Sequence, residues 1–514
     1  MEGMPDDFLK DLKKQFQMIK ENSNDKEVRE KALQNSASKI DEVLSKIKTE
    51  SPDYLRVLSM KASILYENAK ISLTINQFQK AKEYLENSLN LIKDHAENDQ
   101  IAFLYLRVVN YLAYILSRLG KLEIAQSLLE KVIDKGITSN PKVYSTEDLF
   151  SDTKTDENIG KLKIDKLMIN NMQMLGWVYG KVGLKELYAE MQHKCLQKEL
   201  DLNDGDPVQW AMKCYRLASL LLTECKWVLA RYHLAAAQAV LDPLEVGFTP
   251  NPLIYRAQAE LARVWVNYGL HLFSISKKAC LERRLNDESD IIDLEKSPQT
   301  KEDVGNSTFN DLEVSVPNVP VTEILNIQEA KSLFTNTHKW IKRARLYYTL
   351  RDYPIQYVNI VLELSELYRL LAFYEVDVDS AYNLQKKRYD TLETLSGILK
   401  EVRPNCYAAV SVELIREIID VQIELMNLNL KKLYNPDRET NLNESDIKRR
   451  VDTLNDIHAK MENLGEDTQF TSEAGDIDIT SDQIMDKDEA DVKLNESINE
   501  NKGEGEIKIE ELSA

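Results

Sequence analysis

The residue types that carry out chemistry in proteins are dispersed along this chain of 514 residues and form no catalytic motif. The sequence has no GxxxxGK[ST] phosphate loop, no HExxH metal-binding helix and no GxSxG nucleophile turn, and no GxGxxG opens a helix. His193 and Cys195 are possible metal ligands close in sequence, but side chains two residues apart on a helix point to different faces. We therefore expect no catalytic, metal or cofactor site, and we expect that the protein is not an enzyme.

Three further patterns have a structural explanation that competes with a chemical one. Ser297-Pro298 is a possible phosphorylation site, although such dipeptides are common in polar segments. The basic run Lys386-Lys387-Arg388 is better explained as a solvated helix face than as a nucleic-acid patch. The five cysteines show no CxxC spacing, which is typical of buried free thiols in a reducing compartment: Cys195, Cys214, Cys225, Cys280 and Cys406.

The charge balance indicates which kinds of partner the chain takes. Its 66 Lys and Arg residues are outnumbered by 85 Asp and Glu residues, which gives a net charge of −19. An acidic chain is a poor match for nucleic acid or for an anionic membrane. No apolar run reaches the roughly 20 residues that a membrane helix needs, and the amino terminus lacks the apolar core of a signal peptide. We expect a monomer in the cytoplasm that neither binds nucleic acid nor inserts into a membrane.

The stretch Asp206–Leu241 has the pattern of a helical hairpin. Asp206 is a candidate N-cap, and Pro207 at the first helical position has no N–H to leave unpaired. Apolar residues recur at helical spacing on both sides of a polar turn at 223–226, and a run of alanines lets another helix approach closely. Trp210 and Trp227 stand at the two helix starts on the apolar faces, so we expect both to be buried.

Similar hairpins recur along the chain, but not at a steady period. Small or aromatic residues at the expected helix crossings are separated by 44, 63 and 42 residues: Ala81, Ala125, Tyr188 and Ala230. A regular tetratricopeptide (TPR) array repeats about every 34 residues. The segment Leu175-Gly176-x-x-Tyr179 nevertheless matches the core of a TPR first helix. We predict an all-α fold, an irregular TPR-like right-handed α-solenoid.

Composition divides the chain into four parts. Residues 1–281 form an amino-terminal TPR-like helical half, and residues 321–464 form a second helical half that ends in a weaker helix at 446–464. Residues 282–320 are rich in Asp, Glu, Ser, Asn and Pro and have little periodicity, so we expect a disordered linker. Residues 465–514 contain sixteen acidic residues and four lysines, which predicts a disordered acidic tail.

Several blocks of the sequence, in order and with similar spacing, resemble the kinesin-binding protein (KIF-binding protein) family. They are DPVQWAMKCYRLASLLLTECKWVLARYHLAAAQAVL at 206–241, LARVWVNYGLHL at 261–272, NIQEAKSLF at 326–334 and LYRLLAFYEVDVDSAYNLQKKRYDTLE at 367–393. The resemblance runs from about residue 5 to 435 and is lost at the carboxyl end, where the family has further solenoid helices. It implies an irregular TPR-containing α-solenoid that binds the motor domains of a subset of kinesins. It also implies that binding inhibits their attachment to microtubules and so affects the cytoskeleton, axonal transport, mitochondrial positioning and spindle work.

The resemblance directs attention to the first helix of each hairpin, because first helices line the concave side of a TPR-like array. On the helix at 170–182 we predict that Met174 and Trp177 contact the partner, although both are equally well explained as core residues. The helix at 207–222 offers Lys213 and Arg216, and Glu199 lies at the end of the helix between these two. A motor surface that binds acidic tubulin must be basic, so we expect an acidic concave face that imitates the track.

Two other classes of function remain open on the sequence. A generic TPR scaffold or co-chaperone adaptor would hold a carboxylate with Lys and Asn residues in consecutive regular repeats, and the irregular spacing fits such a clamp poorly. An enzyme would need a convergent group of titratable residues in a pocket, which the sequence does not show.

Overall fold

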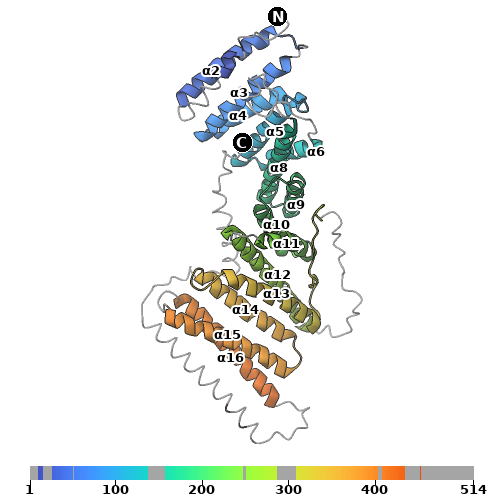
Figure 1. Cartoon of the computed structure of the whole chain (residues 1–514), viewed down its shortest axis with the longest axis vertical. Coiled ribbons are helices and arrows are strands. Elements are labelled where there is room, and N and C mark those ends of the chain that lie inside the picture. The colour runs from blue at the N-terminus through green and yellow to red at the C-terminus, as the bar shows by residue number, and fades with distance from the viewer. Residues whose placement is uncertain are drawn as a thin grey trace. The chain divides into compact units, whose positions relative to one another are not determined.

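The computed structural model describes residues 8, 10–15, 26–49, 51, 53–136, 157–246, 251–285, 308–402, 408–433, 448 and 452. The chain divides into two compact units, Met1–Tyr374 and Glu375–Ala514, which are taken one at a time below. Every regular element in the described residues is a helix and none is a strand, so the predicted all-α class is confirmed (Figure 1).

The first unit is a succession of antiparallel helical hairpins. Within each hairpin the paired helices pack closely: α3 with α4, α5 with α6, α8 with α9, α10 with α11, and α12 with α13. The helices are α2 (Lys26–Lys46), α3 (Tyr54–Thr74), α4 (Phe78–Ile92), α5 (Ala102–Arg118), α6 (Leu122–Lys135), α8 (Glu157–Val182), α9 (Lys185–Leu202), α10 (Pro207–Thr223), α11 (Trp227–Leu241), α12 (Pro252–Leu285), α13 (Ile327–Tyr347) and α14 (Pro354–Tyr374), with the short turns η1 (Lys93–His95) and η2 (Asp242–Val246). None of these described helices is both long and apolar enough to span a bilayer.

Four of the hairpins are closed by the same turn. One residue between the helices has a positive φ of 56° to 87°: Asn76, Gly120, Gly183 and Cys225. The N–H of the next residue then donates to the carbonyl five positions earlier: Gln77 to Ser72, Lys121 to Leu116, Leu184 to Tyr179, and Lys226 to Leu221. This is the Schellman arrangement, which uses a left-handed residue to pair the last carbonyls of a helix. Glycine and asparagine suit that conformation best, which explains three of the four choices.

The hairpin of α10 and α11 forms as its sequence predicts. The carboxylate of Asp206 accepts a hydrogen bond from the N–H of Val208 at 2.9 Å, and Pro207 occupies the first position of α10. Trp210 is buried, and its indole N–H donates to the carbonyl of Leu196 on α9 at 2.9 Å. The prediction for Trp227 is only partly right, because this residue is half-buried.

The segment before α13 departs from the prediction of a disordered linker over 282–320. Residues 282–285 complete α12, and residues 308–326 run in extended conformation along the first unit. In this segment Phe309, Val319 and Ile324 are all buried. The prediction is therefore wrong for 282–285 and 308–320, while 286–307 lie outside the described residues.

The second unit contains the hairpin of α15 (Val378–Val402) and α16 (Ala408–Leu433). Arg388 on α15 is fully buried, and its guanidinium donates to the carboxylates of Glu417 at 2.5 Å and Asp420 at 3.1 Å on α16. Arg388 is therefore not part of a solvated face, as the basic run had suggested. The weaker helix predicted at 446–464 and the acidic tail at 465–514 lie outside the described residues, apart from residues 448 and 452.

Candidate partner-binding surface

Two glycines hold α8 close to α9. A β-carbon on Gly176 would lie 3.0 Å from the amide nitrogen of Gln192, and one on Gly180 would lie 3.4 Å from the ring of Tyr188. Because both residues lack a side chain, the backbone of α8 can approach α9 directly. Trp177 follows the first of these glycines on an exposed side of α8.

Trp177 is a large aromatic residue of α8 that is exposed to solvent. Its side chain is 41% exposed, and the ammonium group of Lys181, one turn further on, lies 5.6 Å from the centre of its ring. The end of α8 and the start of α9 add three exposed apolar residues, Val182, Leu184 and Leu187. Exposed apolar groups of this size beside cations are typical of surfaces that bind other proteins.

A polar network connects α8, α9 and α10 next to Trp177. The carboxylate of Glu199 on α9 accepts hydrogen bonds from the amide of Gln173 at 3.0 Å and from the ammonium group of Lys213 at 2.7 Å. Gln173 lies one turn before Trp177 on α8, so both residues are on the same side of that helix. Arg216, one turn beyond Lys213 on α10, is exposed.

The structure places four of the five residues that the sequence singled out on three helices, of which α9 packs against both α8 and α10. They are Trp177, Glu199, Lys213 and Arg216, of which Glu199 and Lys213 are in direct contact, and we call the four the α8–α10 surface. Met174 is only 6% exposed and belongs to the core, so it does not contribute a free side chain to this surface. Its burial follows from the helix geometry, because residues three apart on α8 are displaced by about 60° around the axis.

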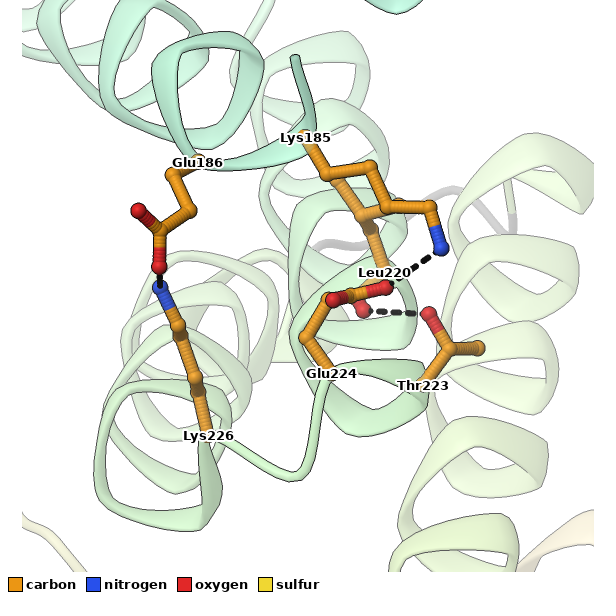
Figure 2. A network of polar contacts seen from close by, with 6 residues as sticks. All are labelled: Lys185, Glu186, Leu220, Thr223, Glu224 and Lys226. Atoms are coloured by element: carbon orange, nitrogen blue, oxygen red, sulfur yellow. Dashed lines mark hydrogen bonds and ion pairs between the residues drawn. The ribbon is translucent and has the colours of Figure 1, made fainter. Parts of the chain in front are cut away.

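Ion pairs fix the turn of the α8–α9 hairpin against the turn of the α10–α11 hairpin (Figure 2). Lys185 bonds to Glu224 at 2.7 Å, and Lys226 bonds to Glu186 at 3.0 Å. The two pairs run in opposite senses, so each hairpin contributes one cation and one anion. Pairs exposed to this degree contribute roughly 0–1 kcal/mol each, so they align the two turns more than they stabilise them.

The charges on the first helices differ from the acidic face that we expected. α10 carries Lys213 and Arg216 and no acidic residue, and α5 carries Arg107 and Arg118 and no acidic residue. On α8 four lysines stand against one Glu and one Asp. The expectation of an acidic face is therefore wrong for these helices, because net charge was extrapolated from the whole chain to one surface.

Two cysteines and two histidines near this surface are held in their neutral forms by burial. Burial raises the pKa of the Cys195 thiol to about 12 and raises that of the Cys214 thiol well above its ordinary value, so neither is a thiolate at neutral pH. Burial also lowers the pKa of His193 and lowers that of His233 to about 4. These groups are structural, and no cluster of three metal-ligating side chains occurs within the described part of the chain.

One contact of His193, which the sequence offered as a possible metal ligand, was not predicted. His193 is paired with His233 on α11, with 3.1 Å between Nδ1 of the first and Nε2 of the second, and not with Cys195. The Nδ1 atom of His233 lies 2.8 Å from the carbonyl of Leu229, which assigns its proton to that nitrogen. No spacing rule predicts this pair, because the two histidines lie forty residues apart on different hairpins.

A family model and individual relatives both indicate similarity to KIF-binding proteins. A family model described as KIF-1 binding protein C terminal matches residues 208–456. The KIF-binding protein of Gallus gallus is 24% identical over 410 residues, which covers 73% of this chain and 67% of that protein. The KIF-binding protein of Homo sapiens is 24% identical over 428 residues, covering 75% and 68% of the two chains. The matched region therefore spans about two thirds of the length of these relatives.

The fold is similar to that of a solved structure described as kinesin binding protein (KBP). The two chains are 16% identical, with a TM-score of 0.54, and the match covers 90% of this chain and 83% of the other. At this identity the likeness shows the fold, and it supports the irregular TPR-like solenoid that the sequence predicts.

Proposed function

Because the chain belongs to the KIF-binding protein family, we propose that it binds the motor domain of a kinesin and keeps that motor from attaching to microtubules. The protein is then a regulator rather than an enzyme. Its activity would be exerted in the cytoplasm and at the cytoskeleton, on the transport of organelles such as mitochondria and on transport along axons.

The observation that carries this proposal beyond family membership is the α8–α10 surface. Trp and Arg are among the residues most enriched at energetically dominant interface positions, and here Trp177 and Arg216 are exposed on α8 and α10, which both pack against α9. Lys213 is already ordered by its ion pair with Glu199, so little side-chain entropy is lost when a partner meets it.

The charges of this surface define what it would meet on the motor. Lys181 lies beside Trp177, and Lys213 and Arg216 are exposed on α10, so the complementary patch is acidic with an apolar depression for the indole. Imitation of the acidic microtubule is therefore not the mechanism that we assign to this face. Instead, the bound protein would cover or obstruct the side of the motor that binds the track, and this also keeps the motor off the microtubule.

Co-sedimentation tests the proposal. A susceptible motor domain should leave the microtubule pellet when the full-length protein is added at saturating concentration. Association should weaken as salt rises, because dissolved ions screen the attraction between exposed charges. At 0.1 M salt the screening length is about 10 Å, and it becomes shorter at higher salt. If every motor in a broad panel stays on microtubules, the proposed function is wrong for this chain.

Variants of the α8–α10 surface locate the interaction. Trp177→Ala and Arg216→Glu should each weaken motor binding by about tenfold or more while helical content stays unchanged. Ile124→Ala on α6 is the matched control, because Ile124 is also an exposed apolar residue but lies on a second helix of its hairpin. Equal affinities for all three variants would place the binding site elsewhere. A titration with the carboxyl-terminal peptide of a chaperone separates this function from that of a co-chaperone adaptor.

A further inference from the structure

The extended segment Thr308–Leu325, which we call the strap, is attached to the first unit at two separate places. Its beginning is anchored by Phe309, and its second half is anchored by Val319 and Ile324. No residue between Phe309 and Val319 is buried. The first attachment is therefore centred on one buried side chain and is separated along the strap from the second.

Phe309 occupies a socket of four aromatic rings from three helices. Its ring stacks on His193 of α9, with 4.6 Å between ring centres and 28° between planes. Trp210 of α10 and His233 of α11 meet it edge-on at 5.1 and 5.4 Å, and Tyr232 of α11 lies at 5.8 Å. Because the helices position all four rings, the socket is formed by the folded hairpins and not by the strap.

The socket also binds the main chain of its occupant. The hydroxyl of Tyr232 accepts a hydrogen bond from the N–H of Phe309 at 2.7 Å, and the side-chain carbonyl of Gln197 accepts one from the N–H of Asn310 at 2.8 Å. Hydrogen bonds to backbone N–H groups do not depend on the side chain that follows. An aromatic residue in an extended peptide is thus the only sequence requirement that the socket imposes at this position.

The second attachment holds the rest of the strap without help from the socket. Arg231 donates to the carbonyl of Val319 at 2.9 Å, and Tyr268 donates to the carbonyl of Pro320 at 2.6 Å. The hydroxyl of Ser276 accepts from the N–H of Ile324 at 3.0 Å, and Arg283 forms an ion pair with Glu323. Release of Phe309 therefore breaks few contacts and leaves the remainder of the strap in place.

A turn follows directly after the anchor. Asp311 has a φ of 60°, in the left-handed region that Asp and Asn adopt more readily than other residues except glycine. This turn separates Phe309 and Asn310 from the second attachment, so a competing peptide has to displace only the first few residues of the strap.

We propose that the socket is a binding site for an extended peptide of another protein, and that Phe309 is a built-in competitor for that site. The peptide carries an aromatic side chain with acidic residues two and four positions later, as Asp311 and Glu313 follow Phe309 in the strap. On the protein side, Lys198 is exposed, follows Gln197 on α9 and carries the charge opposite to that of such carboxylates. This site is distinct from the α8–α10 surface and does not depend on motor binding.

A labelled peptide with the sequence of residues 308–325 tests the competition by fluorescence anisotropy. Full-length Phe309→Ala protein should bind it about tenfold or more tighter than the wild type, because the tethered Phe309 acts at a high effective concentration. The same peptide with Ala in place of its Phe should not bind. Equal binding by the two proteins, or equal binding of the two peptides, would overturn the proposal.

A hydroxyl deletion locates the peptide in the socket. Tyr232→Phe, combined with Phe309→Ala, should weaken peptide binding by about fivefold or more, because one main-chain hydrogen bond is lost. Tyr255→Phe is the matched control, since Tyr255 is an exposed tyrosine on α12. If both substitutions act alike, the peptide binds elsewhere and the proposal is wrong.

Amide hydrogen exchange in the wild-type protein gives a result that does not rely on any variant folding. Saturating peptide should accelerate exchange at the N–H groups of Phe309 and Asn310, because these groups lose Tyr232 and Gln197 as acceptors. Exchange at Ile324 should stay unchanged, since that N–H belongs to the second attachment. Unchanged exchange at Phe309 and Asn310 would overturn the proposal.

Discussion

The indole ring of Trp265 on α12 lies flat against that of Trp340 on α13, with 5.6 Å between ring centres and 7° between planes. Both residues are buried. One turn along α12, Gly269 brings the two helices together, because the side chain of Thr337 occupies the space where a β-carbon would be. The α12–α13 crossing thus combines a stacked pair of tryptophan rings with a glycine that leaves room for Thr337.

Gly269→Ala should destabilise the first unit by about 1–3 kcal/mol or more, because the new methyl group would lie 1.9 Å from the hydroxyl of Thr337. Urea unfolding followed by circular dichroism measures the loss. Gly397→Ala is the control, since a β-carbon there meets nothing within 4 Å. The double change Gly269→Ala with Thr337→Gly should be more stable than the sum of the single effects; strict additivity would show that the clash is relieved some other way.

The two tryptophans of the central hairpin should differ in their contribution to stability. Trp210→Ala should raise the free energy of the folded state by about 3–5 kcal/mol, because it empties a buried site and breaks the hydrogen bond to Leu196. Trp227 is half-buried and makes T-shaped ring contacts with Tyr268 and His271, so Trp227→Ala should cost about 1–3 kcal/mol. Thermal and chemical unfolding of both variants decides the order. A larger loss for Trp227 would contradict the burial that the structure shows.

His233 should make stability fall with acidification. Burial lowers its folded-state pKa from 6.5 to about 4, so the unfolded chain takes up the proton first as the pH falls. The stability contribution is therefore present above about pH 6.5 and is lost progressively down to about pH 4, by about 3 kcal/mol in total.

Comparison of unfolding free energies across that pH window isolates the histidine from the carboxylates. His233→Gln should show a shallower dependence than the wild type between pH 6.5 and 4. His95→Gln is the control, since His95 is exposed, and it should follow the wild-type profile. Parallel profiles for all three proteins would show that His233 titrates normally.

Glu417→Gln should destabilise the second unit by about 1–3 kcal/mol, because the buried guanidinium of Arg388 loses half of its compensating charge. Glu413→Gln is the matched control on the same helix, where the pair with Arg416 is exposed and 3.7 Å long. That control should change stability by about 0.5 kcal/mol or less. Urea unfolding of the two variants measures the difference, and equal losses would mean that burial of Arg388 carries no electrostatic consequence.

The hairpins could be predicted because their signals are local. Helical periodicity, the cap at Asp206 and the turn residues Gly120 and Gly183 each act within their own hairpin. The docking of Phe309 could not be predicted in this way, since its ring neighbours lie 76 residues or more away along the chain, from His233 at 76 residues to His193 at 116. The composition of the strap is mostly polar, so its few buried residues do not stand out in the sequence.

The candidate site was predicted in part, for a geometric reason. Trp177 and Arg216 are exposed where a first helix was expected to present them, whereas Met174 turns into the core. Arg388 illustrates the same limit, because it stands at helical spacing before the buried Leu392 and Leu395. The charge of Arg388 suggested that it is exposed to solvent, whereas its place on the same helix face as these leucines buries it.

The repeated left-handed turn has a consequence for how the chain is made. The hydrogen bonds that close each turn, such as Gln77 to Ser72 and Lys226 to Leu221, join residues of a single hairpin and need no neighbour in place. Closing such a short loop costs little chain entropy and is fast. Each hairpin can therefore close as soon as its second helix has left the ribosome, and synthesis from the amino terminus delivers the hairpins in the order in which they stack.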